Sequence, residues 1–132
     1  MRKAHDKPVL ATITAEKMAG YRAGARRRRR ERAQRTDDRR EQAWALAHEC
    51  ALLLKDRFAA TRVVLFGSLP TQDRFCLESD VDLAAWGVEP GLYLRAVSSV
   101  LALDPEISVD LVRAEDAKAA LMAAINREGI EL

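Results

Sequence analysis

The sequence predicts an α/β fold in which a small β-sheet is flanked by helices and preceded by a long Arg-rich helix. Three short apolar segments alternate with segments of helical periodicity over residues 62–127, and a long Pro-free stretch of helix-forming residues comes before them. The 132 residues, 48% of them hydrophobic, have room for one domain with a modest core. We expect an Arg-rich extension over residues 1–42, largely helical or partly disordered, and the domain itself over residues 43–132.

The long helix is expected from about Thr14 to Ala60, after a loosely ordered segment at residues 1–13. An apolar stripe with steps of three and four residues marks the part that packs on the sheet. The stripe consists of Trp44, Ala47, Ala51, Leu54 and Phe58, widened by Leu46, Cys50 and Leu53. Upstream, the run Arg26–Arg30 has no such stripe and cannot be buried in the domain core.

Three strands and two more helices are expected after this helix. The strands are Arg62–Phe66, Asp80–Trp86 and Ile107–Val112, the helices are Pro90–Leu103 and Ala114–Arg127, and Leu69–Glu78 is a loop. The inner side of the first helix is expected to carry Leu92, Leu94, Val97, Val100 and Leu101, and Gly129 is expected to close the second. In the third strand, Ile107, Val109 and Leu111 share one face, which leaves Ser108 and Asp110 on the other.

The candidate site combines Gly67-Ser68, directly after the first strand, with Asp80 and Asp82, which begin the second. Gly67 has no Cβ, so a phosphate can lie close to the backbone, and Ser68 adds a hydroxyl and an amide donor. Alternate strand residues point to the same face, so Asp80 and Asp82 project together. Two such carboxylates can bind Mg²⁺ together with substrate phosphates. The pattern therefore predicts metal-dependent chemistry on a nucleotide.

Gly67-Ser68, the Asp-x-Asp pair and the later strand Val109-Asp110-Leu111-Val112 resemble the minimal nucleotidyltransferases (MNT) of the DNA polymerase β-type superfamily. The ending 124–130, Ala-Ile-Asn-Arg-Glu-Gly-Ile, looks like the last helix and Gly turn of that branch. The resemblance covers roughly the last two-thirds of the chain. It implies the nucleotidyltransferase fold, a small mixed sheet flanked by helices.

The resemblance also implies a reaction, the transfer of AMP from ATP to a hydroxyl group with release of pyrophosphate. Asp80 and Asp82 would hold the nucleotide-bound Mg²⁺, Asp110 a second Mg²⁺, and Gly67 and Ser68 the β- and γ-phosphates. Asp110 would also help to deprotonate the acceptor. MNT relatives are antitoxins that adenylylate a Tyr of a HEPN-type ribonuclease toxin, so a HEPN-type toxin is the implied partner and acceptor.

One feature departs from the family pattern. Many relatives carry Arg-Gly at the fourth and fifth positions after the Gly, where this chain has Thr71 and Gln72. Arg74, slightly further along, is a candidate to supply the missing charge. This departure motivates an alternative hypothesis, a non-catalytic antitoxin or binding module with a degenerate nucleotide site.

The formal net charge of +2 hides an uneven distribution. Residues 1–42 carry 14 Lys or Arg and 6 Asp or Glu, whereas residues 43–132 carry 8 and 14. The segment Arg22–Arg40 contains ten Arg, for which three interpretations stay open: a solvated helix face, nucleic-acid binding, or docking on an acidic protein or a second copy of the chain. A homodimer through the long helix is one form of the last.

The remaining features favour a cytoplasmic protein. No apolar run reaches the roughly 18 residues of a membrane helix, and no secretory signal is evident. Cys50 and Cys76 form no C-x-x-C pair and have no zinc-binding cluster around them, so we expect reduced thiols.

Overall fold

The computed structural model describes the backbone of residues 2–71 and 74–132, and side chains from residue 14 onward. The chain forms two units, residues 1–35 and residues 36–132. Its elements are α1 (Arg2–Phe58), β1 (Arg62–Phe66), β2 (Val81–Trp86), η2 (Pro90–Leu92), α2 (Tyr93–Leu101), β3 (Val109–Arg113), η3 (Ala114–Asp116), α3 (Ala119–Glu128) and β4 (Ile130–Glu131). The predicted α/β fold is confirmed.

The second unit contains a four-stranded mixed sheet with the order β3-β2-β1-β4. β1 is antiparallel to both β2 and β4, whereas β2 and β3 are parallel. The parallel pair is possible because η2 and α2 carry the chain back to the start of the sheet, as a crossover connection requires.

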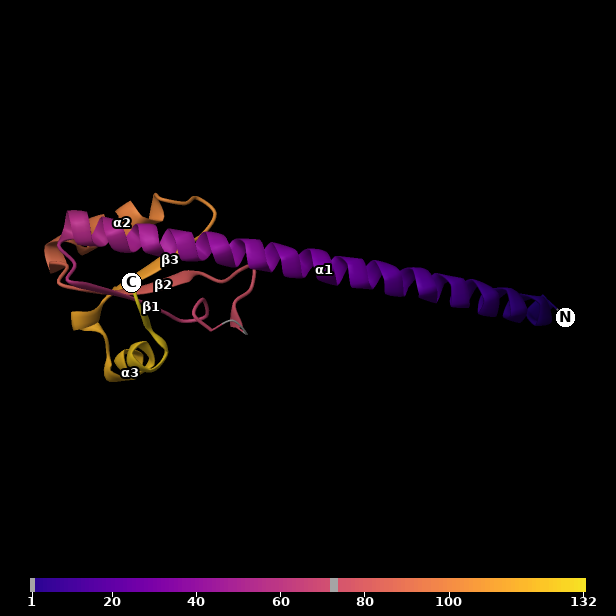
Figure 1. Cartoon of the computed structure of the whole chain (residues 1–132). Coiled ribbons are helices and arrows are strands. Elements are labelled where there is room, and N and C mark those ends of the chain that lie inside the picture. Colours follow the sequence, from indigo (N-terminus) through magenta and orange to yellow (C-terminus); the bar gives the residue numbers. More distant parts are fainter. Residues whose placement is uncertain (1, 72–73) are drawn as a thin grey trace. The chain divides into compact units, whose positions relative to one another are not determined.

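Each face of the sheet packs against different helices (Figure 1). The main core joins α1 from Ala43 onward, α2 and the alternate strand residues Val63, Leu65, Val81, Leu83, Val109 and Leu111. The opposite face carries a smaller cluster, in which Val64 and Ala84 pack on Ile125 of α3. Alternation along each strand therefore divides the sheet into a fully covered face and a partly covered one.

The apolar stripe of the long helix is confirmed, because its residues from Ala47 to Phe58 lie in the main core, with Trp44 and Leu53 packed against it. The helix nevertheless begins at Arg2, so the expected loose segment at residues 1–13 is wrong for the described backbone. Extending a helix that already exists needs no new nucleation, which is the costly step. The boundary expected after residue 42 stays a prediction.

Two further expectations need correction. Leu94 and Leu101 are 76% and 42% exposed, because α2 turns Ala96 and Val100 toward the core instead. The last helix is broken: η3 ends at Asp116 and α3 starts at Ala119, since Ala117 and Lys118 have extended backbone.

Gly129 closes the last helix, as expected. It has φ −71°, and a Cβ there would overlap Val64 Cγ1 and the Ile125 carbonyl oxygen. The chain then adds a short strand, β4, which the sequence did not suggest; Ile130 pairs with Leu65 and Glu131 with Val64.

Among the described residues, no helix combines the length and the apolar character that a membrane span would need.

Candidate nucleotide and metal site

The turn after β1 brings the backbone of Gly67 against the Asp82 carboxylate. Gly67 has φ +81°, in the left-handed region that favours glycine. A Cβ at this position would overlap Asp82 Oδ2, so glycine is required by the close approach as well as by the backbone angle. The next residue, Ser68, is partly exposed, and its carbonyl oxygen accepts a hydrogen bond from Thr71 N at 3.1 Å. The predicted Gly67-Ser68 turn therefore lies directly beside one predicted carboxylate.

Strand pairing places Asp82 next to Asp110. In the parallel register of β2 and β3 the two aspartates are direct neighbours, and Asp82 also faces Phe66 on the antiparallel side. Because Val81 and Leu83 point into the main core, Asp82 points to the face that α3 only partly covers. Asp80 is exposed and lies just before the first residue of β2.

The three carboxylates interact electrostatically. The pKa of Asp82 is raised from 3.8 to about 6, first by burial, then by the charge of Asp110 and then by that of Asp80. Both effects disfavour the ionised form, since burial removes water from the carboxylate and like charges repel it. A bound cation would stabilise the ionised carboxylate, because its positive charge offsets both the loss of hydration and the repulsion from the other two aspartates.

The donor chemistry of this cluster fits a hard divalent cation such as Mg²⁺, which binds carboxylate oxygens. Among the side chains of residues 14–71 and 74–132, however, no three Asp, Glu, His or Cys side chains are arranged as a ready metal-binding group. The carboxylates are close enough to repel one another.

The sequence matches no model of a known protein family, and no curated relative matches it. Solved structures do match. A toxin–antitoxin structure with AMP-PNP is 20% identical over 64% of this chain and 70% of that chain, with a TM-score of 0.55. A tri-AMPylated Shewanella oneidensis HEPN toxin in complex with MNT antitoxin matches at 18% identity over 67% and 70%, with a TM-score of 0.52.

A MntA–HpeT toxin–antitoxin pair, in which two aspartates two positions apart are changed to glutamate, matches at 20% identity over 64% of this chain and 70% of that chain, with a TM-score of 0.54. The chain has the nucleotidyltransferase fold of MNT antitoxins. The expected resemblance is therefore confirmed at the level of the fold.

Two residues that support the site in this MNT fold were missed in the sequence, because they stand at the end of the Arg-rich run. Arg39 Nη2 donates a hydrogen bond to the carbonyl oxygen of Ser79 at 3.3 Å, and the Arg40 guanidinium lies over the Phe75 ring at 5.6 Å. Both contacts reach the loop that connects Ser68 to Asp80. A signal was available: Arg39 and Arg40 lie within about one and a half helical turns of Trp44, where the apolar stripe begins.

The same loop is anchored at several further points. Leu69 and Phe75 are buried in the main core, and the Cys76 amide donates to Ser79 Oγ at 3.0 Å. Arg74 pairs with Glu128 Oε2 at 3.0 Å and donates to Thr71 Oγ1 at 3.3 Å. Its charge is therefore engaged by Glu128, which argues against Arg74 as a replacement for the family's missing Arg. Gln72, the other departure from the family pattern, lies outside the described residues.

The two cysteines are free thiols. Cys50 is buried, and burial raises the pKa of its thiol to about 12, so it is an inert core residue. Cys76 is exposed, in the loop before Asp80.

Proposed function

We propose that this protein is a Mg²⁺-dependent nucleotidyltransferase that transfers AMP from ATP to a tyrosine hydroxyl of a HEPN-type toxin and thereby acts as its antitoxin. One observation carries the proposal: Asp82 lies beside Asp110 on neighbouring strands and against the backbone of Gly67. A phosphate-binding turn and a pair of acidic side chains thus share one end of the sheet.

The matching structures support the same activity. One contains AMP-PNP, and another contains a HEPN toxin that carries three AMP groups in complex with an MNT antitoxin. In a third, two aspartates with the i, i+2 spacing of Asp80 and Asp82 were changed to glutamate. These structures share the fold of this chain at 18–20% identity.

Each site residue has a proposed role. Asp80, Asp82 and Asp110 would hold the two Mg²⁺ ions, whose charge offsets that of the triphosphate. The Gly67 amide and the Ser68 amide and hydroxyl would donate hydrogen bonds to the β- and γ-phosphates. The acceptor oxygen bonds to the α-phosphorus, the bond from that phosphorus to the bridging oxygen breaks, and pyrophosphate leaves. Asp110 accepts the proton of the hydroxyl group.

The test is transfer of label from [α-³²P]ATP to a HEPN protein co-expressed with this chain, with Mg²⁺ present. Wild type should label the HEPN protein, and Asp80→Asn with Asp82→Asn should abolish labelling. Asp56→Asn is a matched control, because Asp56 is exposed on α1 and away from the carboxylate cluster. Equal labelling by the double variant and the control would refute the roles given to these aspartates.

A second candidate function is a non-catalytic antitoxin that acts by occlusion. It is favoured by Thr71, which stands where many relatives have Arg, and by the lack of a ready metal-binding group among the described residues. Titration calorimetry with ATP and Mg²⁺ separates the two candidates. Nucleotide binding without turnover, together with protection from a HEPN ribonuclease by the Asp80→Asn, Asp82→Asn variant, would favour occlusion.

A further inference from the structure

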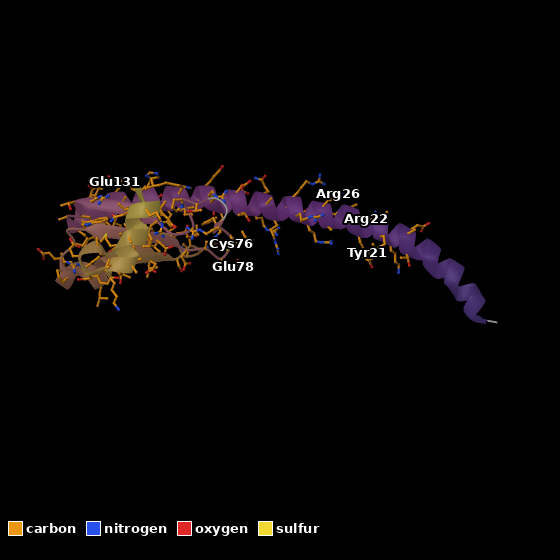
Figure 2. All side chains as sticks on the ribbon, turned by 90° about the horizontal axis from the view of Figure 1, so that it is seen from below. Tyr21, Arg22, Arg26, Cys76, Glu78 and Glu131 are labelled. Atoms are coloured by element: carbon orange, nitrogen blue, oxygen red, sulfur yellow. The ribbon has the colours of Figure 1, made fainter. Side chains whose placement is uncertain are left out.

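The feature that the proposed function leaves unused is the basic segment, defined as residues 22–35 of α1. It contains eight Arg and one acidic residue, Glu31. At 1.5 Å per residue these charges lie along about 21 Å of helix. All eight Arg are exposed, and the side chains of Arg22 and Arg26 project from the helix (Figure 2). The structure thus divides the ten-Arg run into this segment and the pair Arg39 and Arg40, which serves the site loop.

The basic segment has no large apolar side chain through which it could associate with another helix. Apart from Ala23, Ala25 and Ala33 it contains no hydrophobic residue, and none of its residues is buried. A coiled coil needs apolar side chains at two positions of every heptad, so two copies of this segment cannot pair in that way. Two copies would also repel each other.

Five consecutive Arg in the middle of the segment, Arg26 to Arg30, repel one another. None of Arg26 to Arg30 forms an ion pair with a carboxylate of the described residues. Arg22, Arg26 and Arg30 follow one another at a spacing of four, and like charges at that spacing destabilise a helix. A polyanionic ligand would remove this repulsion, so anion binding and helix stability are coupled.

The distribution of charge around the helix indicates which polyanion fits. Successive residues are about 100° apart, so Arg26 to Arg30 surround the whole circumference. A flat acidic protein surface would meet only one side of such a helix. The major groove of B-DNA is wide enough for a helix and has a phosphate backbone on each of its two sides. Arg binds phosphate through two parallel N–H donors.

We propose that the basic segment binds double-stranded DNA by lying in the major groove, with its Arg side chains on both phosphate backbones. The segment contains no Asn and only one Gln, the residues that read adenine, so any base preference is expected to be for guanine, through Arg, with most of the affinity coming from phosphate contacts. Single-stranded nucleic acid is disfavoured, since Tyr21 is the one aromatic residue next to the segment and stacking platforms need several.

The test uses the full chain and a fluorescent 20-base-pair duplex of mixed sequence, followed by anisotropy from about 50 to 300 mM salt. Binding is expected, with log K falling against log salt with a slope of about −4 to −7, as for five to eight phosphate contacts. Replacement of Arg26 to Arg30 by Gln should weaken binding about ten-fold or more near 100 mM salt.

Two control variants separate the segment from net charge and from folding. Lys17→Gln, Arg57→Gln, Arg95→Gln, Lys118→Gln and Arg127→Gln together remove the same number of charges elsewhere and should leave binding within about two-fold. Replacement of Arg26 to Arg30 by Lys keeps the charge and should keep most of the affinity. Circular dichroism of each variant checks that the helix is present.

Four results would overturn the proposal: no duplex binding at 50 mM salt, equal losses in the two Gln variants, tighter binding of a single-stranded RNA of the same length, or tighter binding of polyglutamate. The last would assign the segment to an acidic protein. The Asp80→Asn, Asp82→Asn variant should bind the duplex as wild type does, so the proposal stands or falls separately from nucleotidyl transfer.

Discussion

Gly67 and Asp82 lie so close together that a methyl group on residue 67 would come within 2.2 Å of Asp82 Oδ2. This packing joins the end of β1 to β2, which carries Asp82 and pairs with both β1 and β3. A phosphate that approaches the Gly67 amide would therefore lie next to the carboxylate that is proposed to hold the metal ion.

Replacement of Gly67 by Ala should disturb both the fold and the site. The new Cβ must displace Asp82, and the φ of +81° is strained for alanine, so we expect a loss of about 1–3 kcal/mol in the free energy of unfolding. Urea unfolding measures the loss, and ATP calorimetry should show weakened nucleotide binding. Gly91→Ala is the control, since no atom lies within 4 Å of a Cβ there. Equal stability of the two variants would contradict this account.

Asp82→Asn should stabilise the metal-free protein at neutral and higher pH while it removes activity. The pKa of Asp82 in the folded protein, about 6, lies above its ordinary value of 3.8, so ionisation opposes folding. The free energy of unfolding of wild type minus that of the variant should be independent of pH below about pH 4. It should fall between about pH 4 and pH 6 and be constant again at higher pH. The difference should reach at most about 2–3 kcal/mol.

Melting temperatures between pH 4 and pH 8 would measure this effect. Mg²⁺ should raise the melting temperature of wild type at pH 8 more than that of Asp82→Asn, because the cation relieves a repulsion that the variant lacks. Asp56→Asn provides the comparison for loss of an exposed charge. If Asp82→Asn is less stable than wild type at pH 8, the electrostatic account of the cluster is wrong.

Arg39→Ala should loosen the loop before Asp80 without removing any group that binds nucleotide. Loss of its hydrogen bond to the Ser79 carbonyl costs about 1.5 kcal/mol of loop stability, so we expect kcat/KM for AMP transfer to fall by at most about ten-fold. Hydrogen exchange provides a separate readout, since amides at residues 74–80 should exchange faster. Arg57→Ala, an exposed residue of the same helix, should change neither quantity. A slower reaction with unchanged exchange would show that Arg39 acts in some other way.

Gly129→Ala tests the packing of α3 on the sheet. The added Cβ would overlap Val64 Cγ1 and the Ile125 carbonyl oxygen, so the end of α3 or strand β1 must move. Overpacking of this kind costs about 1–3 kcal/mol, to be measured by thermal unfolding. Because β1 leads into Gly67, AMP transfer should fall as well. Wild-type stability of this variant would show that α3 shifts freely on the sheet.

Local features of the fold could be predicted from the sequence because they depend on neighbouring residues alone. The first strand is an apolar run that stops at Gly67, and the α1 stripe from Ala47 to Phe58 follows the helical period. The faces of the third strand followed in the same way from alternation: Val109 and Leu111 are buried and Asp110 is exposed. Helical and strand periods are properties of the backbone, so no distant contact is needed to recognise them.

Other features depended on which segments meet in space. The rotation of α2 that exposes Leu94 is set by the burial of Ala96 and Val100 in the main core, and the sequence period alone allowed several rotations. The pairing of β4 with β1 involves only two residues, too few for a strand pattern.

From the sequence alone it was determined that Gly67-Ser68 follows a strand and that Asp82 and Asp110 lie on strands, because these are facts of local order and alternation. Asp80 was expected on the same strand as Asp82 but lies just before it. Only the tertiary structure decided that β2 and β3 run in parallel with Asp82 beside Asp110, and that Arg39 reaches Ser79 across a separation of 40 residues. Register and long-range contacts result from the packing of whole elements against one another, and no stretch of neighbouring residues contains that information.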